Sequence, residues 1–247
     1  MKKGKLVLVP TPLDEERPLR SEVRELFLSE VEAIFVFEEP KLAYARWVRV
    51  WGLPRERMSH FYFLNEHNEK AKSEIIAELV AKMRDEGATV YLMSDGGLPA
   101  FCDPGRLLVR ACHQEGIGVS ATPFENSVVL ALALSGFDHD EFLFAGFLPA
   151  KNLDARAKKL QQLLREKRTV ILMDTPYRLK QLCEEVRAAA IASGVWGIKN
   201  RRYCLAMDLN MSKEELLMGE VSSMREQKEK REFILVLEGM NEKNSGR

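Results

Sequence analysis

The chain has 247 residues, of which 46% are hydrophobic and 30% are charged. This length suits one large domain or two small ones, each with a buried core, and the composition excludes a disordered chain as the default. Lysine plus arginine equals aspartate plus glutamate at 37 each, so the formal net charge is zero. That balance excludes a global attraction to nucleic acid but leaves room for a local basic patch.

The first part of the chain alternates short apolar runs with amphipathic segments. The apolar runs predict strands at 5–9, 33–37, 61–64, 89–93 and 119–121. Apolar residues at helical spacing predict helices at 21–31, 42–51, 71–86, 107–115 and 127–134. This alternation is typical of parallel βαβ units.

The alternation weakens at 147–153, which has the character of a linker, and then restarts. We expect helices at 154–165 and 176–192, and strands at 169–173, 203–207 and 233–237. Ser212 followed by Glu215 forms a capping box, which predicts a further short helix. The fold class is therefore α/β with two α/β domains: an N-terminal domain at 1–146 with a mostly parallel sheet, a C-terminal domain at 147–240, and a disordered tail at 241–247.

Four scattered cysteines form no C-x-x-C pair, which favours free thiols in a reducing cytoplasm. No run approaches the roughly 18 apolar residues that span a membrane. The first ten residues hold only about four apolar residues, against roughly 7–15 in a signal peptide. We therefore expect a cytoplasmic protein with no membrane association. The four histidines lack metal-ligand spacing, so we expect no metal site.

The segment 94–105, S-D-G-G-L-P-A-F-C-D-P-G, is the first candidate for a binding site. It connects a predicted strand to a predicted helix, and such loops bind ligands at the carboxyl edge of parallel sheets. Gly96 and Gly97 permit positive φ and close approach of a ligand to the backbone. Asp95 can face a cationic group or hold the loop, and Asp103 with Pro104 suits a helix N-cap and first turn. The alternative is a purely structural turn.

Two further loops, 10–14 and 122–127, should reach the same sheet edge as 94–105. In contrast, 116–121 matches the dinucleotide fingerprint G-x-G-x-x-A but ends a predicted helix and opens a predicted strand. The fingerprint requires the opposite order, so this match predicts a helix end and a strand start.

Six short motifs occur in order over nearly the whole chain: LVPTP at 8–12, EHNE at 66–69, the 94–105 loop, FLF and GFLP within 142–149, TPYR at 175–178, and EFILV at 232–236. Together they resemble the tetrapyrrole methylase superfamily of S-adenosylmethionine-dependent methyltransferases. The resemblance is greatest to the branch that methylates a cytidine 2′-hydroxyl of small-subunit ribosomal RNA.

The resemblance implies two α/β domains with S-adenosylmethionine in the cleft between them, usually in a homodimer. Together with the loop glycines, it places the cofactor-binding residues at Pro12, Met93, Ser94, Asp95, Gly96, Gly97, Leu98, Asn126, Ser127, Asp174 and Ala206.

The chain departs from this family at three places. The usual Glu-Asp-Thr-Arg after the second strand is Glu39-Pro40-Lys41-Leu42, and the usual Gly-Pro-Ser-Ala of the third loop is Phe124-Glu125-Asn126-Ser127. The usual histidine before Glu66 is Asn65. These changes affect the methyl acceptor more than the cofactor.

A ribose hydroxyl is a poor nucleophile and benefits from a general base. The resemblance makes Glu39, Glu66 and His67 the catalytic candidates. The alternatives are that Glu39 interacts with a helix dipole and that Glu66 and His67 hold a turn.

Seven basic residues lie within 151–168, against Asp154 and Glu166. They are either a phosphate-contacting surface for RNA or a solvated helix face. We therefore expect an S-adenosylmethionine-dependent methyltransferase acting on RNA, by ribose 2′-O-methylation of ribosomal RNA, with RNA or a ribosomal subunit as partner. A methyltransferase of a small molecule such as a tetrapyrrole, and a cofactor-binding module without catalysis, are the alternatives.

Overall fold

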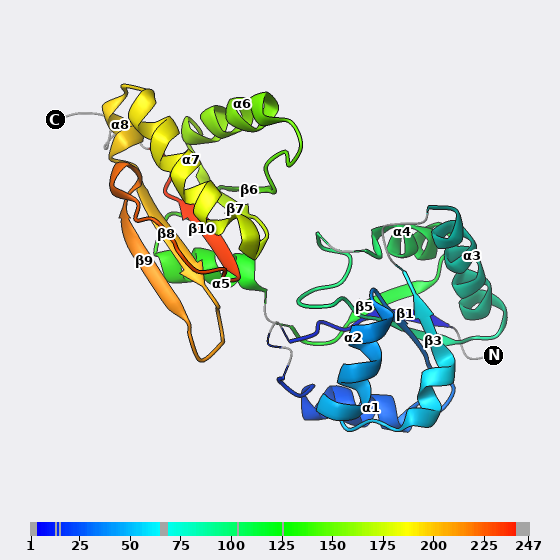
Figure 1. Ribbon diagram of the computed structural model, residues 1–247. Helices are drawn as coiled ribbons and strands as arrows, with labels where there is room; N and C mark the ends of the chain where they lie inside the picture. The colour runs from blue at the N-terminus through cyan, green and yellow to red at the C-terminus, as the bar shows by residue number, and fades with distance from the viewer. Residues whose placement is uncertain are drawn as a thin grey trace. The chain divides into compact units, whose positions relative to one another are not determined.

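The computed structural model describes residues 4–12, 14, 16–64, 69–102, 104–124 and 126–240. It divides into two compact units, Met1–Asn126 and Ser127–Arg247. Among the described residues, each unit has its own five-stranded sheet with helices packed on it (Figure 1). This confirms the prediction of two α/β domains.

The first unit is built on a parallel sheet. Its strands are β1 (Lys5–Leu8), β2 (Ile34–Phe37), β3 (Phe61–Phe63), β4 (Thr89–Leu92) and β5 (Gly118–Ala121), in the order β3-β2-β4-β1-β5. Its helices are α1 (Ser21–Ser29), α2 (Pro40–Ala45), α3 (Glu69–Asp85) and α4 (Arg106–Gln114). A π-helix, Arg46–Val50, continues α2, and a 3-10 helix covers Arg55–His60.

Alternating strand residues build a core on each face of this sheet. Phe35 and Tyr91 pack with Phe27 of α1 and Trp47 of the π-helix. The intervening residues of the same strands pack instead against α3 and α4. The chain leaves β1 toward β2 and leaves β4 toward β5, in opposite directions along the sheet. The gap between β1 and β4 is therefore the topological switch point, where open α/β sheets bind ligands.

The second unit has a mixed sheet. Its strands are β6 (Phe142–Gly146), β7 (Thr169–Met173), β8 (Arg202–Met207), β9 (Glu215–Glu220) and β10 (Phe233–Leu237), in the order β6-β7-β10-β8-β9. Only the β6–β7 pair is parallel among these described strands. Helix α5 (Ser127–Ser135) packs on one face, and α6 (Leu153–Leu164), α7 (Leu179–Ala192) and α8 (Trp196–Lys199) pack on the other.

The boundary between the units lies earlier than residues 146–147. Strand β6 pairs with β7, and α5 packs against β8 and β10, so both elements belong to the second unit. The sequence predicted no strand at Phe142–Gly146, the segment just before the predicted linker at 147–153. The predicted tail at 241–247 lies outside the described residues.

Two further predictions are wrong. Glu215 opens the strand β9 rather than a short helix, because the segment pairs along its whole length with β8. Helix α4 begins at Arg106, after Gly105 with φ +119°, so Pro104 does not occupy its first turn; Asp103 lies outside the described residues. The other predicted elements are present with ends displaced by a few residues, and Gly116 and Gly118 end α4 and open β5 as expected.

Within the part of the chain that the structure describes, no helix is both long and apolar enough to cross a membrane.

Candidate cofactor site

Three loops meet at the carboxyl edge of the first sheet, as the sequence predicted. The Val9 N–H donates to the Leu92 carbonyl at 2.8 Å, and the Thr122 N–H donates to the Leu8 carbonyl at 3.0 Å. These bonds continue the parallel pairing of β1 with β4 and β5 beyond the strand ends. The loops that start at Val9, Met93 and Thr122 therefore begin side by side at the topological switch point.

The first two loops are bonded to each other. Thr11 and Gly97 exchange two backbone hydrogen bonds, of 3.0 and 2.9 Å, in an isolated antiparallel bridge. The buried Thr11 hydroxyl donates to the Ser94 carbonyl at 2.9 Å, and the Ser94 hydroxyl donates to the Gly97 carbonyl at 3.1 Å. Gly97 has φ +85°, a conformation that favours glycine. The loop is therefore held in one shape, with Asp95 and Gly96 half-buried.

Arg46 also holds the 94–97 loop in place. The sequence did not predict a role for this residue. Its side chain is buried, and its guanidinium donates to the Asp95 carbonyl. Arg46 opens the π-helix, and such irregular turns occur frequently at functional sites. The sequence did contain a signal, since helical spacing puts Arg46 on the buried face with Ala43 and Trp47.

The donor set at this edge fits S-adenosylmethionine. Backbone amides and carbonyls of a glycine loop, together with the Asp95 carboxylate, suit the hydroxyl, amino and carboxylate groups of a nucleoside joined to an amino acid. Pro12, Leu98 and Asn126 are half-buried in the three loops. The Met93 side chain is 1% exposed and packs in the core, so only the backbone of this residue is placed to meet a ligand. Ser127 opens α5 of the second unit.

Glu39 is the one predicted catalytic residue within the described chain. It lies just before α2, is exposed, and forms no side-chain capping bond. Strand β2 ends beside β4, where the Met93 N–H donates to the Val36 carbonyl at 2.9 Å. Glu39 therefore follows a strand that ends at the same edge as the 94–97 loop. Glu66 and His67, with Asn65, lie outside the described residues.

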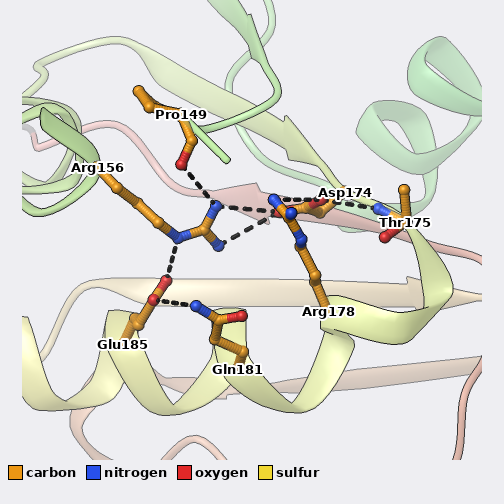
Figure 2. Close-up of polar contacts among 7 residues, drawn as sticks. All are labelled: Pro149, Arg156, Asp174, Thr175, Arg178, Gln181 and Glu185. Atoms are coloured by element: carbon orange, nitrogen blue, oxygen red, sulfur yellow. Dashed lines mark hydrogen bonds and ion pairs between the residues drawn. The ribbon is translucent and has the colours of Figure 1, made fainter. Parts of the chain in front are cut away.

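Asp174, at the end of β7, is committed to a buried ion-pair network (Figure 2). Arg156 donates to one Asp174 oxygen at 3.2 and 3.3 Å and to Glu185 at 2.7 Å. The Thr175 N–H donates to the other Asp174 oxygen at 2.9 Å, and the Arg178 guanidinium lies 4.0 Å from it. Arg156 and Asp174 side chains are each 2% exposed. Arg156 is thus a buried structural residue and not part of the surface that the basic run at 151–168 suggested.

Ala206 lies inside β8, opposite Ile234 and Leu216 of the neighbouring strands. Its side chain is 1% exposed and packs with the α5 side of the core. The cofactor contacts predicted at Asp174 and Ala206 stay predictions.

Comparison with known proteins agrees with this geometry. A sequence profile of the family described as Tetrapyrrole (Corrin/Porphyrin) Methylases matches residues 5–201. The chain belongs to the tetrapyrrole methylases. It is therefore an S-adenosylmethionine-dependent methyltransferase, as the six motifs implied.

The chain is similar to proteins named ribosomal RNA small subunit methyltransferase I. The one from Pasteurella multocida is 31% identical over 96% of this chain and 79% of its own length. The one from Thermotoga maritima is 29% identical over 96% of this chain and 99% of its own length.

Solved structures share the fold. The methyltransferase CobJ covers 96% of this chain and 95% of its own, with a TM-score of 0.60 and 15% identity. The cobalt precorrin-4 methyltransferase CbiF has the same coverage, with a TM-score of 0.55 and 13% identity.

Proposed function

We propose that this protein methylates small-subunit ribosomal RNA on a ribose 2′-hydroxyl. One observation carries the proposal: similarity to proteins named as small-subunit rRNA methyltransferases extends over 96% of the chain and so includes both units. S-adenosylmethionine, held by the 93–98 loop, supplies an electrophilic methyl group on a sulfonium centre.

The protein's own residues align the acceptor and move its proton. The Thr11–Gly97 bridge and the Arg46–Asp95 bond keep the loop in one shape before a ligand arrives. Such preorganisation contributes up to roughly 7–11 kcal/mol when it aligns two reactants. Glu39 offers an exposed carboxylate at this edge, which would accept the hydroxyl proton as the methyl is transferred.

The second unit supplies a basic surface that suits RNA. On and beside α6, exposed side chains form no ion pair with any described residue: Lys151, Lys158, Lys159, Arg165 and Lys167. Lys158 and Arg165 are seven residues apart and so lie on one side of α6, two turns from each other. Unpaired cations on one face are what phosphate binding needs. Arg168 does not contribute in this way, because it pairs with Glu166 at 3.0 Å.

The proposal is tested by methyl transfer. Purified protein is mixed with S-adenosylmethionine labelled on its methyl group and with small ribosomal subunits from a strain that lacks the gene. Label should enter the RNA, and Glu39→Gln should lower the rate by about 100-fold or more, the range for loss of a general base. Glu56→Gln, at an exposed glutamate on the 3-10 helix, is the matched control and should not change the rate.

Label that enters tetrapyrroles rather than RNA would support the small-molecule alternative instead. Cofactor binding without transfer to any fraction would support a module without catalysis. RNA affinity gives an independent measure. The slope of log binding constant against log salt concentration should become less steep by about two when Lys158 and Arg165 are both changed to alanine.

We further propose that the protein acts in the cytoplasm as a homodimer. Helix α5, S-V-V-L-A-L-A-L-S, is apolar on all sides, and such helices are usually buried. In the chain alone, Val129 and Leu134 remain exposed. Light scattering of the wild-type protein should therefore give twice the chain mass of 28.2 kDa, and the Val129→Glu variant should give the mass of one chain. A wild-type protein of single mass at micromolar concentration would contradict this.

A further inference from the structure

Tyr177 is held out into solvent on a short turn of the second unit. At 75% exposure it is the most exposed large apolar or aromatic side chain in the described chain. It lies in the 3-10 turn Pro176–Arg178, between β7 and α7. Exposed aromatic rings are common in binding sites and have no role in packing a core.

The residues on both sides of Tyr177 in the chain are bonded to the buried network around Asp174 (Figure 2). The Arg178 N–H donates to the Thr175 carbonyl at 2.9 Å, and the Thr175 N–H donates to the Asp174 carboxylate at 2.9 Å. Arg156 in turn holds Asp174 from the core. Pro176 restricts the backbone further. Because the backbone is held at both ends, binding a ligand on the ring orders only the side chain and not the turn.

A lysine lies over the ring. The Lys230 Nζ is 4.5 Å from the centroid of Tyr177, within the range of a cation–π interaction. Lys230 comes from the segment 224–232, which runs back along α7. The Met224 carbonyl accepts from Arg187 at 3.3 Å, and Glu226 pairs with Lys180 at 2.8 Å. This path brings the exposed Lys230 to the turn, with the exposed Lys228 two residues earlier in the same segment.

The charges that remain at the turn are mainly positive. Glu226 is neutralised by Lys180, and the negative charge of buried Asp174 is balanced by Arg156. Lys228 and Lys230 form no ion pair with a described residue, while Glu229 is the acidic side chain between them. A protein partner would need an apolar pocket around the ring, whereas the neighbours Thr175 and Arg178 are polar. An aromatic ring among cations suits a base with its phosphates.

We propose that Tyr177 binds an unpaired nucleotide of the RNA substrate, with the base stacked on the ring and the adjoining phosphates facing Lys228 and Lys230. The inference rests on the proposed function, since it assumes that RNA is the substrate. Duplex RNA would not bind in this way, because its bases are already stacked.

Fluorescence anisotropy with a labelled single-stranded RNA of about 12 nucleotides, within the range of a single-strand site, tests the proposal. Tyr177→Ala should weaken binding by about 5- to 150-fold, the range for loss of one stacked base, and Tyr177→Phe should restore it. Lys230→Gln should lower the slope of log binding constant against log salt concentration by about one. The matched control is Trp196→Ala, which removes a ring of 55% exposure at the other end of α7 and should change nothing.

Each contrary result has a distinct meaning. Unchanged RNA affinity in Tyr177→Ala would overturn the inference, as would weakened S-adenosylmethionine binding in calorimetry, because the ring would then serve the cofactor. Normal RNA binding with lost methylation of intact subunits would assign the ring to a ribosomal protein and also overturn it. If wild-type protein shows Tyr177-dependent RNA binding but methylates no RNA, the proposed function fails, and Tyr177 remains an RNA-binding residue whose RNA is not the methyl acceptor.

Discussion

The buried network around Arg156 yields a quantitative prediction. Arg156 holds Asp174 at 3.2 Å and Glu185 at 2.7 Å, with side-chain exposures of 2%, 2% and 28%. Arg156→Met would leave the Asp174 carboxylate buried, with the Thr175 N–H at 2.9 Å and the Arg178 guanidinium at 4.0 Å still near it. Removing one partner of a buried ion pair costs about 3–5 kcal/mol. We expect the free energy of unfolding of the second unit to fall by that amount.

The same reasoning predicts that a second change repairs the first. In Arg156→Met with Asp174→Leu, no unpaired charge is buried, and Glu185 keeps its bond from Gln181 at 2.8 Å. This double variant should lie within about 2 kcal/mol of the wild type. Arg178→Met is the control and should cost less than about 1 kcal/mol, because Arg178 is 32% exposed and 4.0 Å from its partner.

Urea unfolding followed by circular dichroism measures these differences. Amide hydrogen exchange in peptides from α6 and β7 assigns them to the second unit, which is needed because two units need not unfold together. The reasoning would be refuted if Arg156→Met were as stable as the wild type, or if the double variant were less stable than the single one.

Three further predictions concern the first unit and the cysteines. Gly97→Val should abolish S-adenosylmethionine binding in calorimetry, since a β-branched residue does not tolerate φ +85°, whereas Gly116→Ala, at φ +65° with open space around it, should leave affinity unchanged. Arg46→Met should weaken cofactor binding by about 10- to 100-fold, the loss of one charge-assisted hydrogen bond; equal loss in exposed Arg49→Met would contradict the role of the Asp95 contact. A thiol reagent should label exposed Cys102 quickly, and Cys102→Ser should remove the fast phase. The other thiols should react slowly, because burial raises their pKa values, to about 11 for Cys112 and Cys204 and about 12 for Cys183.

Predictions from the sequence succeeded where a local pattern carries the information. The apolar run at 89–93 followed by a glycine-rich loop defines β4 and the carboxyl edge of the sheet, and the structure confirms both. The prediction failed at Glu215, where a capping box is a local helix signal but pairing with β8 makes a strand. The hydrogen bonds of six paired residues outweigh one local capping preference.

Arg46 and Arg156 show the same limit for single residues. Each is a charged side chain whose partner lies far along the chain: Asp95 for Arg46, and Asp174 and Glu185 for Arg156. In the sequence, Arg156 is one of seven basic residues and has no distinguishing mark. Whether a charge faces water or a buried carboxylate depends on which helix packs on which, so the run at 151–168 contains both surface cations and a core residue.

The sequence by itself determined the two α/β domains, the family and the glycine-rich loop at the sheet edge, because these follow from strand and helix periodicity and from motifs that are continuous in the chain. Tertiary structure decided the boundary between the units, because β6 pairs with β7 of the second sheet and this pairing cannot be read from the local sequence. It also decided that Asp174 is paired in the core while Tyr177, three residues later, is held in solvent. Burial and ion pairing are properties of contacts between distant segments, and no local pattern encodes them.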